Sequence, residues 1–263
     1  MYNQYFAGTI DITEMVLYLF FAFFLCLVIY LQNEGTREGF PIEDDVTGKI
    51  ESNNGFFFRA ADPKAYLMSD GTTRMKPDGI RDTHDMSFKR TAAWSGAPIE
   101  PVGNPLTSGV GPGAYAIRAD VPDMTSHGSV RIAPLRIAPD YFTDPKDAQL
   151  VGMTLVGNDK KSGGTITDIW VDRAEFLIRY LEVATINADG TGTGKTVLVP
   201  MTMCAVKKAT KTVLLDAVYG HQVAGAPQLA NPNQITLLEE EKCVGYFGAG
   251  YLYATKEMVE PLL

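Results

Sequence analysis

Cysteine and histidine are scarce in this chain of 263 residues. The three cysteines, Cys26, Cys204 and Cys243, lie far apart and include no Cys-x-x-Cys pair. The three histidines are equally scattered, and none belongs to a His-Glu-x-x-His motif. The sequence therefore indicates neither a disulfide framework nor a zinc ribbon, and it contains no recognisable metal-ligand spacing.

Positive charge is also in short supply. The 23 Lys and Arg residues are outnumbered by 31 Asp and Glu residues, which gives a formal net charge of −8 at pH 7. Nucleic-acid binding needs a basic surface, so the composition argues against a nucleic-acid partner. With 46% apolar and 21% charged residues, the chain is not a disordered one, and its length suits one large domain or two small ones.

Motifs of catalysis and nucleotide binding are missing as well. There is no Gly-x-Ser-x-Gly and no spacing that pairs a Cys with a His, so a tethered hydrolase is a weak hypothesis. The segment DGTGTGKT (189–196) resembles a phosphate-binding loop, but Asp189 stands where that motif needs Gly. It also leads into the strand-like TVLVPM instead of a helix, and we interpret it as a hairpin loop.

Charge is entirely absent from residues 15–31, MVLYLFFAFFLCLVIYL. With its flanks this run has about 20 residues, which at about 1.5 Å per residue span roughly 30 Å of hydrocarbon. A cleaved signal peptide, the alternative, needs basic residues before the apolar run, and residues 1–14 contain none. We expect a retained transmembrane helix over residues 12–32.

Lys and Arg are unevenly distributed about this helix. None precedes it, whereas Arg37 and Lys49 follow it. Basic flanks stay on the cytoplasmic side, so we expect residues 1–11 to be periplasmic and the body of the protein to be cytoplasmic.

The remainder of the chain changes character along its length. Residues 33–105 are rich in turn signals and prolines and are expected to be an irregular surface region, with short extended pieces such as FFFRA (56–60) and KAYLM (64–68). From about residue 130, alternating segments separated by Gly-rich turns predict a small antiparallel barrel or sandwich. The last segment, from about residue 236, is the best helix candidate.

Two features of that C-terminal helix leave alternatives open. Gly245, Gly248 and Gly250 either weaken the helix or mark close packing. The run Glu239–Glu241 is most simply a solvated helix face, but it could also help to dock the barrel or extend the acidic surface.

The segment TDIWVDRAEFLIRY (167–180) carries several charges inside an otherwise strand-like sequence. As a hairpin, it would place Asp172 and Glu175 at its turn and Arg179 on the return strand, with Trp170, Phe176 and Tyr180 as packing residues. These charges are either solvated turn residues or a working set of titratable groups. Residue patterns alone favour the first interpretation.

Several longer motifs resemble one known family. The single N-terminal membrane helix is followed by REGFP (37–41), GAPIEPVGNP, GVGPGAYAIRADVPD, TDIWVDRAEFLIRYLEV and ITLLEEEKCVGYFGAGYLYAT. Together they are similar to the H subunits of the photosynthetic reaction centres of purple bacteria, in the same order and over nearly the whole chain.

This resemblance implies a mainly β fold: one transmembrane helix, an irregular region, and residues 106–263 as a cytoplasmic PRC-barrel domain with a C-terminal helix. It implies a single-pass protein of the bacterial inner (intracytoplasmic) membrane. The chain would cap the L and M subunits, shield the quinones from water and help to deliver protons to the secondary quinone, without a catalytic site of its own. Light-harvesting antenna, a cytochrome and membrane lipid are further expected partners.

The resemblance also implies that this chain binds no cofactor alone. Bacteriochlorophyll, bacteriopheophytin, the quinones and the non-haem iron would be held by other subunits.

Residue by residue, Asp172, Glu175 and Arg179 match the family's proton-transfer cluster, and Asp168 is a candidate extension of it. Near the expected proton entrance, Asp123 and His127 match the family pattern. An acidic position of that pattern is Thr125 here, and the second histidine position is Ser129. His127 is then the one histidine expected to exchange protons with solvent, unless it is simply a surface residue.

A different hypothesis remains beside this one. A membrane-anchored PRC-barrel protein could instead act as an assembly or scaffold factor.

Overall fold

The computed structural model describes residues 11–37, 42–44, 46–51, 61–68, 71–79, 86–187 and 189–258. The chain divides into two compact units. The first comprises Met1–Asp82 and Ala92–Ala97, and the second comprises Thr83–Thr91 and Pro98–Leu263. Apart from Asp11, the expected periplasmic segment lies outside the described residues, as does the extended piece FFFRA.

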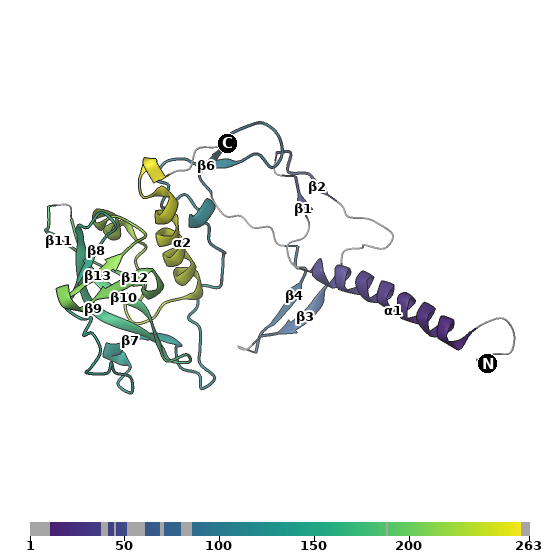
Figure 1. The fold of residues 1–263 in the computed structure, drawn as a ribbon, viewed down its shortest axis with the longest axis horizontal. Coiled ribbons are helices and arrows are strands. Elements are labelled where there is room, and N and C mark those ends of the chain that lie inside the picture. Colours follow the sequence, from purple (N-terminus) through teal and green to yellow (C-terminus); the bar gives the residue numbers. More distant parts are fainter. Residues whose placement is uncertain are drawn as a thin grey trace, which may run out of the picture. The chain divides into compact units, whose positions relative to one another are not determined.

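The apolar run forms helix α1, Ile12–Gly35 (Figure 1). Asp11 caps its start by accepting a hydrogen bond of 2.9 Å from the Thr13 backbone N–H. None of its residues is buried within the protein, and by length and composition it can cross a membrane. The expected helix is confirmed and continues three residues further, because residues 33–35 remain helical up to the Thr36 cap.

The Thr36 hydroxyl fastens the end of α1 to the chain that follows. It donates to the Asn33 carbonyl at 2.7 Å and accepts from the Ala61 N–H at 3.1 Å. Glu34 and Arg37 form an ion pair of 2.7 Å beside it. Hydrogen bonds of Thr36 and an ion pair therefore stabilise the C-terminal end of α1 within the first unit.

In the described part of the region expected to be irregular, there are three small two-stranded antiparallel sheets, formed by β1 with β2, β3 with β4, and β5 with β6. The extended piece at KAYLM is β3, and its Lys64 pairs with Lys76. The bounds of these strands are β1 Ile42–Glu43, β2 Ile50–Glu51, β3 Lys64–Leu67, β4 Thr73–Lys76, β5 Phe88–Arg90 and β6 Ile99–Pro101.

The second unit is built on a seven-stranded sheet with the order β11-β10-β9-β8-β13-β12, in which β7 also pairs with β9. All of its pairs are antiparallel except β13 with β8. The strands are β7 Ile132–Pro134, β8 Thr154–Val156, β9 Ser162–Asp172, β10 Leu177–Ile186, β11 Gly192–Pro200, β12 Cys204–Lys207 and β13 Thr212–Leu215. Short 3-10 turns lie before, between and after these strands: η1 Gly111–Gly113, η2 Leu135–Ile137, η3 Met201–Met203, η4 Lys208–Thr210, η5 Gly220–Gly225 and η6 Lys256–Met258.

Strand β9 organises the unit because it has partners on both edges. One edge pairs with β10, while the other pairs with β8 near its start and with β7 near its end. The segment expected to be a hairpin is therefore confirmed, with Asp172 opposite Leu177 at the turn. The hairpin loop expected at 189–196 was only partly right, because strand β11 already begins at Gly192 and includes the rest of that segment.

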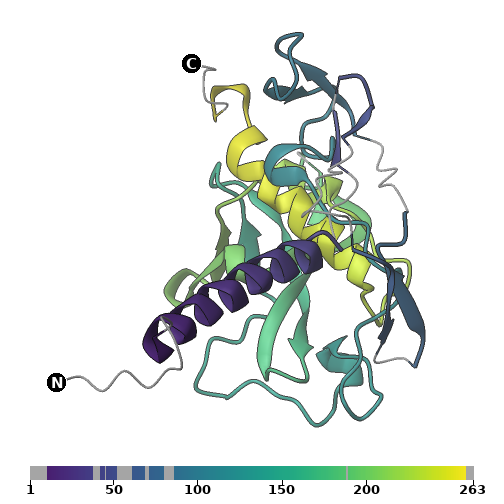
Figure 2. The ribbon, with the colours of Figure 1, turned by 90° about the vertical axis from the view of Figure 1, so that its right-hand side faces the viewer.

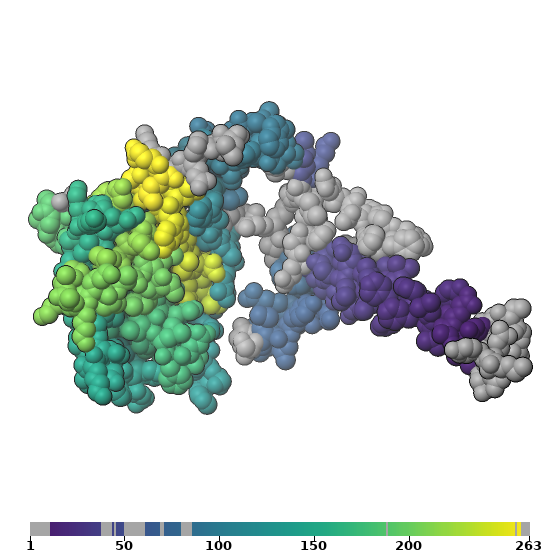
Figure 3. All heavy atoms as spheres, viewed as in Figure 1, coloured from purple at the N-terminus to yellow at the C-terminus, as the bar shows by residue number. Residues whose placement is uncertain are grey.

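Helix α2, Leu237–Tyr253, lies against this sheet (Figures 2 and 3). The hydrophobic core contains side chains from the strands and from the helix. Trp170 and Tyr180 are buried as expected. The prediction for Phe176 was wrong: this side chain is 77% exposed, because residue 176 has a left-handed backbone (φ 57°) at the hairpin turn.

The glycines of α2 mark close packing. A Cβ on Gly248 would lie 2.8 Å from the Pro112 carbonyl oxygen, and one on Gly250 would lie 2.3 Å from the Ala217 carbonyl oxygen. Only a residue without a side chain lets the helix approach these two segments so closely.

Candidate functional site

The turn between β9 and β10 is organised by the carboxylate of Asp172. Its Oδ1 accepts hydrogen bonds from the backbone N–H groups of Ala174 at 2.9 Å and Glu175 at 3.0 Å. This arrangement explains why an aspartate ends the strand, since a short carboxylate can bond to the amides that follow it. The Asp172 side chain is fully buried, so it is not a solvated turn residue.

Arg131 is the centre of the charged site. Its backbone directly precedes β7, in which Ile132 pairs with Asp172, so the strand pairing carries the arginine to the hairpin turn. Its Nε lies 3.1 and 3.0 Å from the two carboxylate oxygens of Asp172. Its Nη1 bonds to Asp123 at 3.1 Å and its Nη2 to Glu175 at 2.5 Å. We call Arg131, Asp123, Asp172 and Glu175 the Arg131 cluster.

The charges of this cluster lower the pKa of its buried member. Burial by itself raises the pKa of Asp172, but the Arg131 guanidinium and the amides of Glu175 and Ala174 outweigh it and hold that pKa below its usual value. The same carboxylates raise the pKa of Arg131. Asp172 and Arg131 are thus a fixed ion pair, whereas Glu175, about half exposed, is open to solvent.

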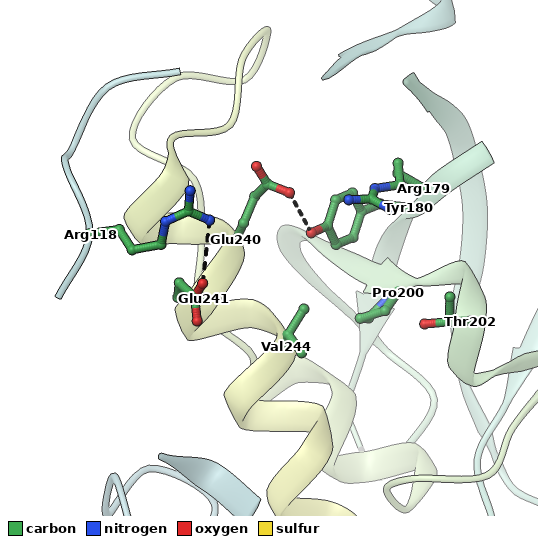
Figure 4. Close-up of a pocket in the computed structure, with 8 residues that line it drawn as sticks. All are labelled: Arg118, Arg179, Tyr180, Pro200, Thr202, Glu240, Glu241 and Val244. Atoms are coloured by element: carbon green, nitrogen blue, oxygen red, sulfur yellow. Dashed lines mark hydrogen bonds and ion pairs between the residues drawn. The ribbon is translucent and has the colours of Figure 1, made fainter. Parts of the chain in front are cut away.

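Arg179 lies between the Arg131 cluster and a nearby hollow. Its Nε lies 3.9 Å from Asp172 Oδ2, which is a weak ion pair. Arg179 also lines a hollow of about 250 Å³ between β10 and α2, together with Tyr180 and Glu240 (Figure 4). We call this the Glu240 hollow.

Glu240 has the opposite protonation preference to Asp172. Burial raises the pKa of Glu240, and the hydrogen bond from the Tyr180 hydroxyl together with the charges of Arg179 and Arg118 only partly compensates. The hydroxyl–carboxylate distance is 3.1 Å. A half-buried carboxyl group whose pKa is raised is well suited to take up and release a proton.

The three glutamates of α2 are all bonded, so their interpretation as a solvated face was wrong. Glu239 and Thr236 form a capping box at the helix start. Glu240 bonds to Tyr180 on β10, and Glu241 pairs with Arg118 at 3.4 Å. Of the three, Glu240 alone bonds to a barrel strand, and this contact fits the alternative interpretation that the run helps to dock the barrel.

The candidate proton entrance lies on the loop between Asp123 and Arg131, two members of the Arg131 cluster. The chain bonds to itself at the base of this loop, where the Arg131 N–H donates to the Asp123 carbonyl at 2.8 Å. His127 is exposed at its tip. Thr125 and Ser129, the two positions that depart from the family pattern, bond to each other across the loop.

Asp168 lies in a separate group. It bonds to Arg136 at 2.9 Å, and the same guanidinium nitrogen bonds to Glu182 at 2.7 Å. The Trp170 indole N–H also donates to Glu182, at 2.9 Å. Four residues along a strand span about 13 Å, which explains why Asp168 and Asp172 have different arginine partners.

The structure thus brings Asp123, Asp172, Glu175 and Arg179 together and gives Asp168 other partners. The sequence analysis did not identify Arg131 or Glu240 as members of the site. Arg131 was visible only as one charge in an alternating strand, and Glu240 as one of three adjacent glutamates. Across the ranges that the structure describes, no group of His, Cys, Asp and Glu side chains is arranged to hold a metal ion.

Two family models match the sequence. The first is the photosynthetic reaction centre H-chain N-terminal region, which matches residues 4–137. The second is the PRC-barrel domain, which matches residues 146–222 and thus the strands β8 to β13.

Proposed function

Because the chain belongs to the H-chain family of the photosynthetic reaction centre, we propose that it conducts protons to the secondary quinone through the Arg131 cluster. The chain is a subunit of a photosynthetic reaction centre, and its apolar helix α1 fits a membrane-anchored protein. The proposal adds that it caps the L and M subunits from the cytoplasmic side of the bacterial inner membrane. Those subunits would hold the bacteriochlorophylls, bacteriopheophytins, quinones and iron.

The observation that carries the proposal is the convergence of three carboxylates on one guanidinium. Closely spaced carboxylates titrate as a set, and the charge on one depends on the protonation of the others. Arg131 keeps the buried Asp172 ionised and contacts the carboxylates of Asp123 and Glu175 with its other two nitrogens. A proton that reaches Asp123 or Glu175 from water can then be passed on without the cluster acquiring a large net charge.

Glu175 is the group proposed to transfer the proton out of this chain. It lies at the tip of the β9–β10 hairpin, in direct contact with Arg131, and about half of its side chain is exposed. Asp123 and the exposed His127 are the proposed acceptors of protons from solvent. The chain has no proposed catalytic site, since electron transfer belongs to cofactors on other subunits.

The test is the rate of the second reduction of the secondary quinone in reaction centres that contain the Glu175→Gln variant. We expect slower reduction with normal assembly, because glutamine keeps the hydrogen-bond acceptor but cannot carry a proton. Glu100→Gln is the matched control, since Glu100 pairs with Lys89 on the small β5–β6 sheet. Equal rates in both variants and the wild type would refute proton conduction through Glu175.

The alternative of an assembly or scaffold factor is separated by co-purification. A reaction-centre subunit remains in stoichiometric amount with the bacteriochlorophyll absorbance, whereas an assembly factor is lost from the mature complex.

A further inference from the structure

Two exposed phenylalanines line one groove on the second unit. Phe142 is 84% exposed and Phe176 is 77% exposed. Both line a hollow of about 540 Å³, together with Tyr141 and Leu177. Single exposed apolar residues are ordinary, but aromatic side chains gathered around one hollow are typical of an interaction site. We call this hollow the Phe176 groove.

The backbone at Phe176 gives a second, independent observation. Its φ of 57° is uncommon for a bulky residue and would be met more easily by Gly or Asn. The strained turn presents a phenylalanine to solvent, where its ring stacks on Tyr141 with 5.8 Å between centroids. One face of the ring covers Tyr141 and most of the side chain stays in solvent, so a large apolar surface is left free for a partner outside the chain.

The charged residues that line the groove are all acidic. Asp140, Asp144 and Asp147 line it, and no basic residue does. The neighbouring guanidiniums are engaged elsewhere, since Arg173 donates to the Val130 carbonyl at 2.7 Å and Arg136 binds Asp168. Lys146 is an exposed base in the same loop and offsets part of this acidity.

We propose that the Phe176 groove docks a basic segment of another reaction-centre subunit, with at least one apolar side chain seated between Phe142 and Phe176. The acidic rim attracts Lys and Arg side chains, and it repels the anionic headgroups of membrane lipids. The aromatic walls bury the apolar side chain. This proposal rests on the proposed capping role and adds the surface through which the chain caps its partners.

The position of the groove connects docking to proton transfer. Phe176 directly follows Glu175 at the hairpin turn. A partner segment seated on Phe176 would therefore cover the same turn that carries the proposed proton donor. Docking would bring the acceptor chain and Glu175 into one environment from which bulk water is excluded.

The experiment measures binding of the full-length chain in detergent to a reaction-centre core prepared without it, over a series of salt concentrations. The apolar variant is Phe142→Ser with Phe176→Asn, because asparagine tolerates the left-handed turn. The charge variant changes Asp140, Asp144 and Asp147 to Asn. Val151→Ser is the matched control, since Val151 is exposed but does not line the groove.

We expect the apolar variant to bind about tenfold more weakly or worse, which corresponds to about 1.4 kcal/mol. The charge variant should bind more weakly at low salt and show a smaller salt dependence than the wild type. A photoreactive phenylalanine analogue at position 142 should cross-link to a Lys- or Arg-containing segment of another subunit.

Different failures have different meanings. If the wild-type chain binds the core and both groove variants bind as tightly as the control, the docking proposal is overturned while the capping role stands. Cross-links only to lipid or to a second copy of the chain would also overturn it. If the wild-type chain does not bind the core, the capping role fails and the docking proposal fails with it.

Discussion

Two carboxyl groups of the site, Asp172 and Glu240, have pKa values shifted in opposite directions. Asp172 is fully buried but bonded to a guanidinium and two amides, and its pKa is lowered. Glu240 is half-buried with a tyrosine hydroxyl as its bonded partner, and its pKa is raised. The difference lies in the partners rather than in the depth of burial, and it assigns the two groups different roles. The lowered pKa favours the charged form of Asp172, and the raised pKa favours the protonated form of Glu240.

The opposite shifts predict opposite dependences of stability on pH. The stability from Asp172 is complete above its unfolded pKa of about 3.9 and is lost as pH falls through the lower folded value. The stability from Glu240 is complete below its unfolded pKa of about 4.3 and is lost as pH rises through the higher folded value. In denaturant titrations of the full chain in detergent, Asp172→Asn should therefore weaken the acid-induced loss of stability.

Glu240→Gln should have the converse effect in the same titrations. It should remove the loss of stability on raising the pH from about 4.3, because glutamine keeps the acceptor for Tyr180 without a charge. Identical pH profiles for the wild type and both variants would contradict these assignments.

Removal of Arg131 should be more costly than removal of either carboxylate charge. Arg131→Leu leaves the buried Asp172 charge with two backbone N–H groups and the distant Arg179 guanidinium, and breaking a buried ion pair in this way costs about 3–5 kcal/mol. The double variant Arg131→Leu with Asp172→Asn should recover much of this loss, because the buried charge is then gone. Thermal unfolding of the single and double variants measures the difference, and equal losses would show that the pair is not the cause.

For individual residues, the sequence predicted which ones lie at the turn but not which residues they bond to. The positions of Asp172 and Glu175 followed from the hairpin pattern, which is local. Arg131 lies 41 residues before Asp172, so its role depends on the pairing of β7 with β9, which no local pattern reveals. Phe176 looked like a packing residue because the strand pattern gave no sign that its backbone is left-handed.

Among the elements, β9 and α2 hold the site together. Strand β9 carries Trp170 into the core and ends on Asp172, so the same strand fixes both the barrel and the cluster. Helix α2 lies against η1 through its glycines and reaches β10 through Glu240. Placement of the helix therefore determines the geometry of the Glu240 hollow.

The glycines of α2 provide a graded test of that placement. An exposed Gly→Ala change in a helix normally stabilises by about 0.5–1 kcal/mol. Here we expect destabilisation that is greatest for Gly250→Ala, where the added Cβ would lie 2.3 Å from a carbonyl oxygen, and smaller for Gly245→Ala, where it would lie 3.1 Å away. Gly192→Ala, with no atom within 4 Å, is the control. Equal unfolding temperatures for all three variants would show that the helix can move without cost.

The elements themselves were largely predictable from the sequence. The membrane helix, the β9–β10 hairpin and the C-terminal helix each have a continuous local signal, and each was confirmed. The small sheets before residue 105 were only partly anticipated, because their strands are too short for a clear periodic pattern. The parallel pairing of β13 with β8 joins distant segments and was not predicted.

For the whole molecule, the distribution of Lys and Arg predicts which side of the membrane holds the second unit. No basic residue precedes α1 in the sequence, while Arg37 and Lys49 follow it. In sealed membrane vesicles with the cytoplasmic face outward, added protease should therefore digest the barrel and leave a fragment that contains α1. Digestion of the barrel only in vesicles of the opposite orientation would reverse the proposed topology.

Proton uptake from solution after the second of two light flashes tests proton delivery by this chain most directly. It is measured with a pH-indicator dye in reaction centres that carry the wild-type chain, Glu175→Gln or Glu100→Gln. We expect uptake in Glu175→Gln to be slower by about tenfold or more, within the range of a lost proton-transfer group. A small weak acid in the buffer should restore it, because such an acid can replace the missing carboxyl group. Uptake at the same rate with all three chains would contradict proton delivery through the Arg131 cluster.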